Sequence, residues 1–377
     1  MQALVTIPNG SAAVQQVPIP SPSHGQVRVR VKTIALNPVD ALYVAKPASA
    51  PGRVVGSDFA GIVEDVGEGV THLKVGVRVA GFMHGACQEN VFPGAFAEYL
   101  AVDADLVYQV PASVNLEDAA TIPLCANTAT NGLFRVLGLD APWGTRSTSA
   151  DTSAGTRPAI LVYSGATSVG LYAIQLARLS PSNPLIITTA SPSNVAYLKS
   201  IGADHVLDYH DANWTSQART LAREGNAEFK WALDGISEGS TVETVSQVFE
   251  GKGKIATVRG PSQWAQDGIK KGVDVEYMAA WTMLGKEFWY NGGIHFPAEP
   301  IHRALAVKLY EYLSASNPQS PLASGAFKPN KVRLMPGGLD RVTEAFPLLG
   351  VGRVTERKTG DWKPLSAEKM VYRLEQD

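Results

Sequence analysis

The chain has few cysteines, which argues against a disulfide-rich secreted domain and against a structural zinc site. Among its 377 residues only Cys87 and Cys125 carry a thiol. Two thiols cannot form the disulfide framework of a small secreted domain, and they fit a reducing compartment. A structural zinc site usually needs about four Cys or His ligands, so the shortage also argues against such a site. The expected location is the cytoplasm.

Charge and long apolar runs are scarce as well. Charged residues make up 18% of the chain, and the formal net charge is −2, which gives no basic surface for nucleic acid. No run approaches the roughly 18 apolar residues that a membrane helix needs. The first residues lack the basic and apolar regions of a signal peptide. We therefore expect no nucleic-acid partner and no membrane association, in a chain long enough for two domains.

What the chain does contain is a strand, a small-residue turn and a helix start in direct succession. Residues 159–163 are apolar, residues 164–169 are mostly small, and apolar side chains take helical spacing from Gly170. Such a turn presents backbone N–H groups and the positive end of a helix dipole to an anion. The dinucleotide fingerprint is met at Gly165 and Gly170, but Thr167 replaces its middle glycine. One interpretation is an ordinary strand–helix turn. The other is a dinucleotide site, in which the Thr167 hydroxyl would donate to a phosphate.

Hydrophobic patterns predict an α/β chain of two domains. Short glycine-bounded strands before residue 125 are typical of a small β-barrel. From residue 159 onwards strands alternate with helices, which predicts a doubly wound parallel sheet. The expected strands are 27–31, 61–67, 75–80, 95–102, 159–163, 185–189, 205–207, 229–233, 254–258, 273–280, 331–335 and 370–374. The expected helices are 116–122, with Asn115 as N-cap, 128–139, 170–179, 194–201, 215–223, 242–249, 301–313 and 339–349, and an exposed loop is expected at 141–158.

The end of the second strand of such a sheet selects the nicotinamide cofactor. An acid there binds the ribose 2′-hydroxyl of NAD, whereas its absence suits the 2′-phosphate of NADP. The corresponding segment has no acid, and its Ser191, Ser193 and Asn194 can donate to a phosphate, with Lys199 close behind. Tyr209, after the third strand, can reach the same group. The cofactor expected from the residues is therefore NADPH.

Four stretches in chain order resemble the medium-chain dehydrogenase/reductase superfamily, which combines a GroES-like β-barrel catalytic domain with a Rossmann cofactor domain. They are 29–40 (VRVKTIALNPVD), 56–67 (GSDFAGIVEDVG), 75–79 with 94–99 (VGVRV and GAFAEY), and the stretch around Gly170. The resemblance implies a catalytic domain at 1–127 and 314–377 and a cofactor domain at 128–313. Zinc-dependent members keep a Cys near residues 36–38 and a His-Glu pair where this chain has Ser57 and Asp58. Catalytic zinc is therefore not expected, and the leftover His84, Cys87 and Cys125 make no convincing site.

Among zinc-free members the chain most resembles fungal trans-acting enoyl reductases of the lovastatin-pathway type. The markers are 35–40 (ALNPVD), the Ser/Thr-rich insertion, 191–194 (SPSN), 206–209 (VLDY), 281–282 (WT) and 365–371 (LSAEKMV). The resemblance implies reduction of the α,β-double bond of a carrier-protein-bound polyketide, a polyketide synthase or polyketide–peptide hybrid synthase as partner, and a monomer. Leu42 departs from the lovastatin-type enzyme, which has a Lys there, and this signals a different substrate.

The same resemblance assigns site residues. It implies NADPH contacts at Val39, Asp40, Ala41, Leu42, Ala166, Thr167, Ser168, Val169, Ser191, Pro192, Ser193, Asn194, Tyr209, Arg259, Gly260, Ser366 and Ala367. It implies a substrate pocket lined by Ala129, Thr130, Asn131, Gly132, Leu133, Phe134, Arg135, Val136, Gly285, Lys286, Glu287, Phe288 and Trp289.

Thr128 is the candidate catalytic residue, because a hydroxyl at the start of a helix has the positive helix end behind it and can stabilise an enolate oxygen. A simple N-cap is the alternative. The aromatic residues near Trp281 and Phe288 suit an acyl chain or interdomain packing equally. Two other functions remain open: a free-standing quinone or enone reductase, and a non-catalytic NADPH-binding protein. The residues identify no proton donor.

Overall fold

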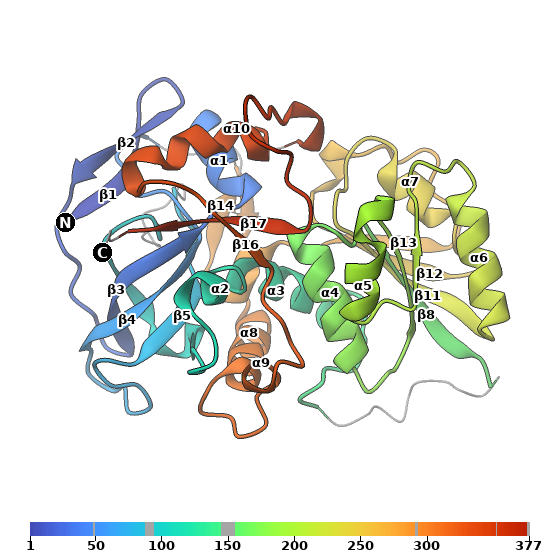
Figure 1. Cartoon of the computed structure of the whole chain (residues 1–377), viewed down its shortest axis with the longest axis horizontal. Coiled ribbons are helices and arrows are strands. Elements are labelled where there is room, and N and C mark those ends of the chain that lie inside the picture. Colours follow the sequence, from blue (N-terminus) through green and yellow to red (C-terminus); the bar gives the residue numbers. More distant parts are fainter. Residues whose placement is uncertain (48–49, 87–93, 145–154, 291–292, 352, 375–377) are drawn as a thin grey trace. The chain divides into compact units, whose positions relative to one another are not determined.

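The computed structural model describes residues 1–47, 50–86, 94–144, 155–290, 293–351 and 353–374. These fold into two compact units (Figure 1). The first consists of Met1–Leu124 and Trp281–Asp377, and the second of Cys125–Ala280. The second unit therefore ends about 33 residues before the boundary expected at residue 313. The reason is helix α8 (Pro300–Leu313), which packs against strand β7 (Val107–Gln109) of the first unit.

The first unit is built on a seven-stranded sheet with strand β3 at its centre. The order is β16-β17-β3-β4-β5-β7, and β6 also pairs with β3. All neighbours are antiparallel except β16 and β17, which run parallel. The strands are β3 (Gln26–Ala35), β4 (Asp58–Val66), β5 (Arg78–Phe82), β6 (Tyr99–Asp103), β7 (Val107–Gln109), β16 (Lys331–Leu334) and β17 (Glu368–Arg373).

Alternation along β3 explains why this sheet encloses a core. Val27, Val29 and Val31 are buried, whereas Arg28 and Arg30 between them are more exposed. The buried valines join one continuous apolar cluster with residues of β4, β5 and the C-terminal segment. The expected GroES-like β unit is confirmed.

The remaining elements of the first unit surround this sheet. Two hairpins are β1 (Gln2–Ile7) with β2 (Ser11–Gln16), and β14 (Phe288–Tyr290) with β15 (Ile294–Phe296). The helices are α1 (Pro38–Ala45), α2 (Leu116–Ala120), α8, α9 (Pro321–Ser324) and α10 (Phe346–Leu349). Asn115 caps α2 as expected, because its side chain accepts the Asp118 N–H at 2.7 Å.

The second unit is a six-stranded parallel sheet in the order β10-β9-β8-β11-β12-β13. In chain order this is 3-2-1-4-5-6, the order of dinucleotide-binding sheets. The strands are β8 (Arg157–Tyr163), β9 (Leu185–Thr189), β10 (His205–Leu207), β11 (Ala227–Asp234), β12 (Gly253–Thr257) and β13 (Val273–Tyr277). The expected doubly wound parallel sheet is confirmed.

Helices cover both faces of this sheet. Helices α4 (Ser168–Leu179) and α5 (Val195–Ser200) lie on one side, and α6 (Trp214–Glu224) and α7 (Thr241–Ser246) lie on the other (Figure 1). Apolar residues of α6 and α7 pack with those of β8, β9 and β11 in one cluster. Of the loop expected at 141–158, residues 145–154 lie outside the described residues.

One helix prediction was wrong at its start. The helix expected from Thr128 begins five residues earlier, as α3 (Pro123–Thr130), and continues as a π-helical segment, Asn131–Val136. Pro123 suits the first turn of a helix, since its missing N–H has no partner there anyway. The segment expected as one helix at 339–349 is a 3₁₀ turn, Leu339–Ala345, followed by α10, with Pro347 in its first turn.

Candidate active site

Close packing fixes the shape of the turn after β8. Ser164 adopts a φ of 63°, and its N–H donates to Thr189 Oγ1 at 2.9 Å. A Cβ at Gly165 would overlap Thr188 Oγ1. A Cβ at Gly170 would lie 2.5 Å from the Ser164 carbonyl oxygen, so only glycine lets helix α4 start this close to the turn. The two fingerprint glycines that the chain retains are therefore required by geometry.

Thr167 has a different task from the expected one. It is the N-cap of α4: its Oγ1 accepts the Gly170 N–H at 3.0 Å and donates to the Ser164 carbonyl at 2.8 Å. The hydroxyl proton is thus used inside the turn, and a phosphate contact of Thr167 stays a prediction. Capping by a threonine satisfies one N–H of the first helical turn and fixes the turn's shape.

The end of β11 lies beside this turn. Asp234 pairs in register with Tyr163, and the Gly235 N–H donates to the Tyr163 carbonyl at 3.2 Å. The Asp234 carboxylate is buried and accepts the N–H groups of Ile236 and Ser237, each at 2.8 Å. Burial raises its pKa. Strands β8 and β11 flank the point where the strand order reverses, which is where doubly wound sheets bind ligands.

The loop after β9 is open and contains no acid. A short 3₁₀ turn, Pro192–Asn194, follows Ser191, and Pro192 and Ser193 are exposed. The first acid further along is Asp204, which is already paired with Arg178 at 2.7 Å. Tyr209 is 41% exposed and stacks against His210, with ring centroids 4.0 Å apart. The structure thus places the expected phosphate donors on an accessible loop.

Arg259 is less available than expected. Its guanidinium pairs with Glu238 at 2.9 Å and donates to the Ile236 carbonyl at 3.2 Å. The Arg259 carbonyl in turn accepts from Thr257 Oγ1 and from the Trp264 indole. The side chain therefore organises the loop after β12, and Gly260 beside it has open space around its Cα.

Thr128 lies in the interior of α3, so the positive helix end does not stand behind its hydroxyl. Its side chain is buried. Both readings that placed it at a helix start, the dipole-supported donor and the N-cap, were wrong in that respect. A catalytic role for its hydroxyl stays a prediction.

The stretch 129–136 is mostly occupied by contacts inside the second unit. Asn131 Nδ2 donates to the Ala279 carbonyl at 3.2 Å, and Arg135 bonds to Asn131 and pairs with Glu276. A Cβ at Gly132 would overlap Met278 Sδ. Phe134 is half-buried and packs edge-on against Trp143. The π-helical turn of this stretch is a geometry often found at functional sites.

The first unit contains a buried polar cluster formed by five residues, here called the acid–lysine cluster. Its members come from α1 and the start of β4, each with the residue before it, and from β17: Asn37, Asp40, Ser57, Asp58 and Lys369. All five are at most 3% exposed. Sequence reasoning noted Ser57 and Asp58 only as missing metal ligands and missed Lys369, which lies about 300 residues further along the chain.

Hydrogen bonds connect the cluster completely around Asp58. Lys369 Nζ donates to Asp58 Oδ2 at 2.5 Å, and Asn37 Nδ2 donates to the same oxygen at 2.9 Å. The Leu124 N–H donates to Asp58 Oδ1 at 2.7 Å. A buried carboxylate with a paired ammonium group and further donors is the arrangement that keeps both charges in the interior. The Asp58 carboxylate, which stands where zinc-dependent members carry an acid, is therefore already paired with the Lys369 ammonium group.

Asp40 has no cation of its own in the cluster. Its Oδ1 accepts the Ser57 hydroxyl at 2.7 Å, and its Oδ2 accepts the Asn37 N–H at 2.7 Å. Burial raises the pKa of Asp40 to about 7, and the Asp58 charge adds to the rise; the hydrogen bonds from Ser57 and Asn37 and the Lys369 charge oppose it. Asp40 was expected to contact the cofactor, but its carboxylate is engaged inside the first unit.

The other expected cofactor residues of the first unit lie on α1 and before β17. Val39 and Leu42 are half-exposed, whereas Ala41 is buried. Ser366 and Ala367 precede β17, and Ala367 is buried with a φ of 53°. No role of these residues in cofactor binding is tested by the structure, and it stays a prediction.

An aromatic group fills the interior near α1. His84 stacks on Trp281 with ring centroids 4.1 Å apart, contacts Phe288 edge-on, and bonds to the Tyr43 hydroxyl through Nε2 at 3.1 Å. Burial lowers the pKa of His84 to about 3, so its imidazole is neutral. Trp281 and Phe288 thus pack within the first unit.

The expected substrate residues 285–289 lie beside this aromatic group. Lys286 pairs with Asp103 at 3.2 Å, and Glu287 with His295 at 3.4 Å. Phe288 is fully buried, but Trp289 is 41% exposed and packs on His295. Only part of this stretch is therefore free to contact a ligand.

No group of three or more His, Cys, Asp or Glu side chains within the described ranges is arranged to hold a metal ion. Cys125 is buried, and Cys87 lies outside the described residues. Within those same ranges, no helix combines the length and the apolar character that crossing a membrane would require.

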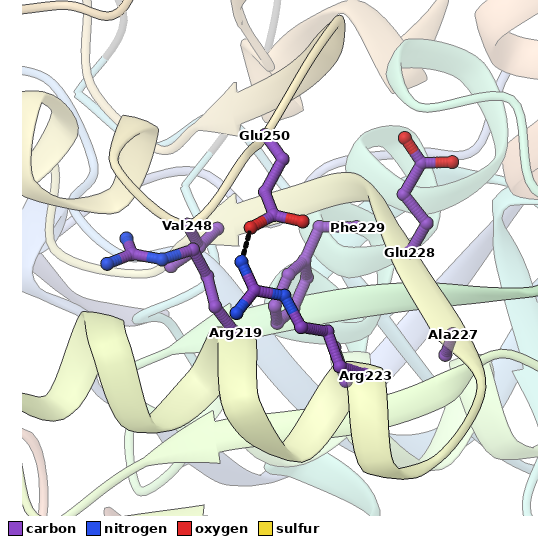
Figure 2. Close-up of a pocket in the computed structure, with 8 residues that line it drawn as sticks. Arg219, Arg223, Ala227, Glu228, Phe229, Val248 and Glu250 are labelled. Carbon is purple, nitrogen blue, oxygen red and sulfur yellow. Dashed lines mark hydrogen bonds and ion pairs between the residues drawn. The ribbon is translucent and has the colours of Figure 1, made fainter.

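A surface pocket of the second unit lies away from the turn after β8 (Figure 2). It is lined by residues of α6, the start of β11 and the segment after α7, including Arg219, Arg223, Glu228 and Glu250. Arg223 pairs with Glu250 across it. Because it adjoins the amino end of β11, it is at the opposite end of the strand from the ligand-binding edge of such sheets. We assign it no cofactor role.

Comparison with known proteins agrees with both units. The family model for the alcohol dehydrogenase GroES-like domain matches residues 23–112, and the model for the zinc-binding dehydrogenase matches residues 168–275. The solved structure of an alcohol dehydrogenase superfamily protein from Novosphingobium aromaticivorans shares the fold with a TM-score of 0.74 at 21% identity, covering 100% of each chain.

Relatives extend along the whole sequence. Trans-enoyl reductase ACTTS2 of Alternaria alternata is 31% identical over 99% of both chains. Trans-enoyl reductase gkaC of Penicillium citrinum is 30% identical over 95% of this chain and 92% of its own. A zinc-type alcohol dehydrogenase-like protein of Schizosaccharomyces pombe is 30% identical over 92% and 94%. With its GroES-like sheet, its 3-2-1-4-5-6 parallel sheet and these full-length relatives, the chain belongs to the medium-chain dehydrogenase/reductase superfamily, a family of oxidoreductases with an NAD(P)-binding domain.

Proposed function

We propose that this protein is an NADPH-dependent trans-acting enoyl reductase, which reduces the α,β-double bond of a polyketide intermediate bound to a carrier protein. The observation that carries the proposal is the similarity to trans-enoyl reductases over 99% of the chain. The acid–lysine cluster supports a zinc-independent reaction, because Ser57 and Asn37 are poor zinc ligands and Asp58 is already paired with Lys369.

The choice of NADPH rests on the loop after β9. Its Ser193 is exposed, and the segment from residue 190 to residue 203 contains no acid that could bind a ribose 2′-hydroxyl. The glycine-lined turn and the N-terminus of α4 would hold the pyrophosphate through backbone N–H groups, and the bound cofactor would supply the hydride. Binding is tested by thermal unfolding: NADPH is expected to raise the melting temperature, by mass action, far more than the same concentration of NADH. Equal stabilisation would contradict the choice.

Activity is tested with 2-enoyl thioesters and quinones in parallel. We expect NADPH to be consumed with a 2-enoyl thioester of pantetheine, faster when the same acyl group is attached to a carrier protein, and not with a quinone. Consumption with quinones alone would favour a free-standing quinone reductase. Binding of NADPH without consumption in any assay would favour a non-catalytic protein.

The proposed role of Thr128 has its own test. If its hydroxyl stabilises the enolate oxygen, Thr128→Val is expected to lower kcat by about 10²-fold, the scale of one lost oxyanion donor. Because Thr128 is buried in α3, thermal unfolding of the variant must show that the second unit still folds. Unchanged turnover would remove Thr128 from the reaction.

A further inference from the structure

Several polar groups at the carboxyl edge of the parallel sheet are left without a partner. The hydroxyl oxygens of Thr167 and Thr189 each accept an N–H group of the turn after β8. Across the residues that the structure describes, the hydroxyl groups of Ser191, Ser193 and Tyr209 form no hydrogen bond with another protein atom. These three hydroxyl groups follow β9 and β10, and they are available to a ligand.

The loops after β9 and β10 lie side by side at this edge. The two strands are parallel neighbours, with Leu207 opposite Thr189, and the Ala190 N–H donates to the Leu207 carbonyl at 2.9 Å. Neighbouring strands are about 4.8 Å apart, and β10 is the outermost strand of the sheet. The cofactor's 2′-phosphate is held at the loop after the second strand, so the loop after β10 borders that position.

These two loops, residues 190–194 and 208–213, contain a single residue that can carry a positive charge, His210. Lys199 is in the last turn of α5, the end that points away from the loop after β9. Arg259 follows β12, three strands from β9 and hence about 14 Å away by strand spacing, and it is paired with Glu238. His210 is therefore the cation nearest to a 2′-phosphate.

Asp208 fixes the orientation of the His210 ring. Its Oδ1 bonds to His210 Nδ1 at 2.7 Å and accepts the His210 N–H at 3.0 Å, and these hydrogen bonds lower the pKa of Asp208. The Tyr209 ring stacks on the imidazole. The His210 side chain is 62% exposed, and within the described parts of the chain its Nε2 has no partner. Since Nδ1 faces the carboxylate, Nε2 is the nitrogen that can face a ligand.

The elements packed on β10 bring no other charge to His210. Strand β9 and residues 190–194 contain no titratable side chain. None of the titratable groups of the two packed helices is bonded to His210 in the described ranges; they are Tyr197 and Lys199 on α5, and Arg219, Arg223 and Glu224 on α6. Asp211 accepts the Asn213 N–H at 2.8 Å and the Gln217 side chain at 2.7 Å, so its carboxylate is held at the start of α6. The charge of His210 is therefore balanced by Asp208 alone.

We propose that His210 is the residue that recognises the 2′-phosphate of NADPH and that Asp208 is its positioning residue. The inference rests on the choice of NADPH in the proposed function. A protonated imidazole donates Nε2–H to a phosphate oxygen in a charge-assisted hydrogen bond, and the hydroxyl groups of Ser191, Ser193 and Tyr209 add neutral donors.

This arrangement makes the cofactor preference depend on pH. Histidine is the side chain that ordinarily changes its charge between about pH 5 and about pH 8. When His210 is neutral, it no longer balances Asp208, and the Asp208 carboxylate repels the phosphate. NADH has no 2′-phosphate, so its binding does not respond to this change. The preference for NADPH therefore falls as the pH rises.

The first experiment uses two half-cofactors that differ only in the 2′-phosphate, 2′,5′-ADP and 5′-AMP. Calorimetry with the full-length protein at about pH 6.5 measures both Kd values. His210→Gln, which cannot become charged, is expected to bind 2′,5′-ADP about tenfold more weakly and 5′-AMP unchanged. The matched control is His205→Gln, at the opposite end of β10, which should bind both probes as the wild type does. An equal loss for both probes in His210→Gln would overturn the inference.

The second experiment follows the ratio of the Kd for NADH to the Kd for NADPH from about pH 6.5 to about pH 9. A phosphate monoester has a second pKa of about 6, so the 2′-phosphate stays mostly doubly charged over this range. The ratio is expected to fall about tenfold in the wild type. It should stay high in His210→Lys, which keeps its charge, and low in His210→Gln. A fall in His210→Lys equal to that of the wild type belongs to another group and contradicts the inference.

Asp208→Asn tests the positioning residue. The variant lacks the carboxylate that favours a charged imidazole, so the fall in the ratio should occur at lower pH. An unchanged pH course would remove Asp208 from the scheme.

The half-cofactors also separate this inference from the proposed function. If the wild type binds 2′,5′-ADP no more tightly than 5′-AMP, the choice of NADPH fails and the inference fails with it. If the wild type prefers 2′,5′-ADP and His210→Gln keeps the full preference, the inference alone fails. Neither result depends on turnover of an enoyl thioester.

Discussion

Gly165 and Thr188 are packed so closely that a side chain at Gly165 would overlap Thr188 Oγ1. The Thr188 hydroxyl is fixed there because it donates to the Val162 carbonyl at 2.6 Å. The turn after β8, which would hold the cofactor, is thus packed against β9. Neither residue can move away without breaking a contact between the first two strands of the sheet.

Gly165→Ala is therefore expected to destabilise the protein and to weaken cofactor binding. Forcing a methyl group into a packed site costs about 1–3 kcal/mol, and the cost falls on the same turn that would hold the pyrophosphate. Urea unfolding measures the first effect and titration with NADPH the second. Gly251→Ala is the control, since a Cβ at Gly251 meets no atom. Equal behaviour of the two variants would contradict the packing argument.

An acid in the loop after β9 is expected to reverse the cofactor preference. Ser193→Asp places a carboxylate where the 2′-phosphate of NADPH would bind, so repulsion should raise the Kd for NADPH by about tenfold or more and leave NADH binding less affected. Titrations with both cofactors measure the ratio. Thr220→Asp adds the same charge at an exposed site on α6 and should not change it. A parallel loss of affinity for both cofactors in Ser193→Asp would count against the assignment.

The stability of the protein should depend on pH through Asp40. Its folded pKa of about 7 lies above the ordinary Asp value of 3.8, so the folded state binds the proton more tightly than the unfolded chain. The Asp40 contribution to the free energy of unfolding is therefore largest at low pH and declines as the pH rises from about 4 to about 7. The decline is at most about 4 kcal/mol, since each pKa unit corresponds to 1.36 kcal/mol.

Asp40→Asn isolates this contribution. Denaturant unfolding of the wild type and the variant across that pH range is compared as a difference, which cancels all other titrating groups. We expect the variant to gain stability relative to the wild type as the pH rises. A constant difference would show that Asp40 is ionised throughout.

Removing one partner of the Lys369–Asp58 pair should destabilise the protein more than removing both charges. Lys369→Met leaves the Asp58 carboxylate buried without its cation, which is expected to cost about 3–5 kcal/mol. Adding Asp58→Asn removes the orphaned charge and should recover part of that loss. Urea unfolding of both single variants and the double variant completes the cycle. Additive losses would mean that the two groups do not interact.

The sequence predicted the second unit well because its signals are local. The apolar runs of β8, β9 and β11 and the helical spacing of α4 lie within short windows, and each matches its observed element closely. The start of α3 at Pro123 was missed because residues 124–127 are all buried, so they show no alternation of apolar and polar positions that would predict a helix.

The candidate site was harder to predict because its contacts are distant in sequence. Lys369 meets Asp58 across 311 residues, and no local pattern joins them. The N-cap role of Thr167 was not predicted, because a hydroxyl's partner depends on the shape of its turn. That Lys369 pairs with Asp58 and not with Asp40 can be seen only when the residues of α1, β4 and β17 are placed together.

The division of the chain into two units also sets the order in which the units can fold. The second unit is continuous, and its last residue, Ala280, is synthesised before strand β17. The central sheet of the first unit waits for β17, whose Val371 pairs with Ala35 of β3. Because domains fold as units during synthesis, the Rossmann sheet can form first, whereas β3 must remain without one neighbour until β17 has been synthesised. Lys369, which is part of β17, thus joins Asp58 only after the residues of the second unit have been synthesised.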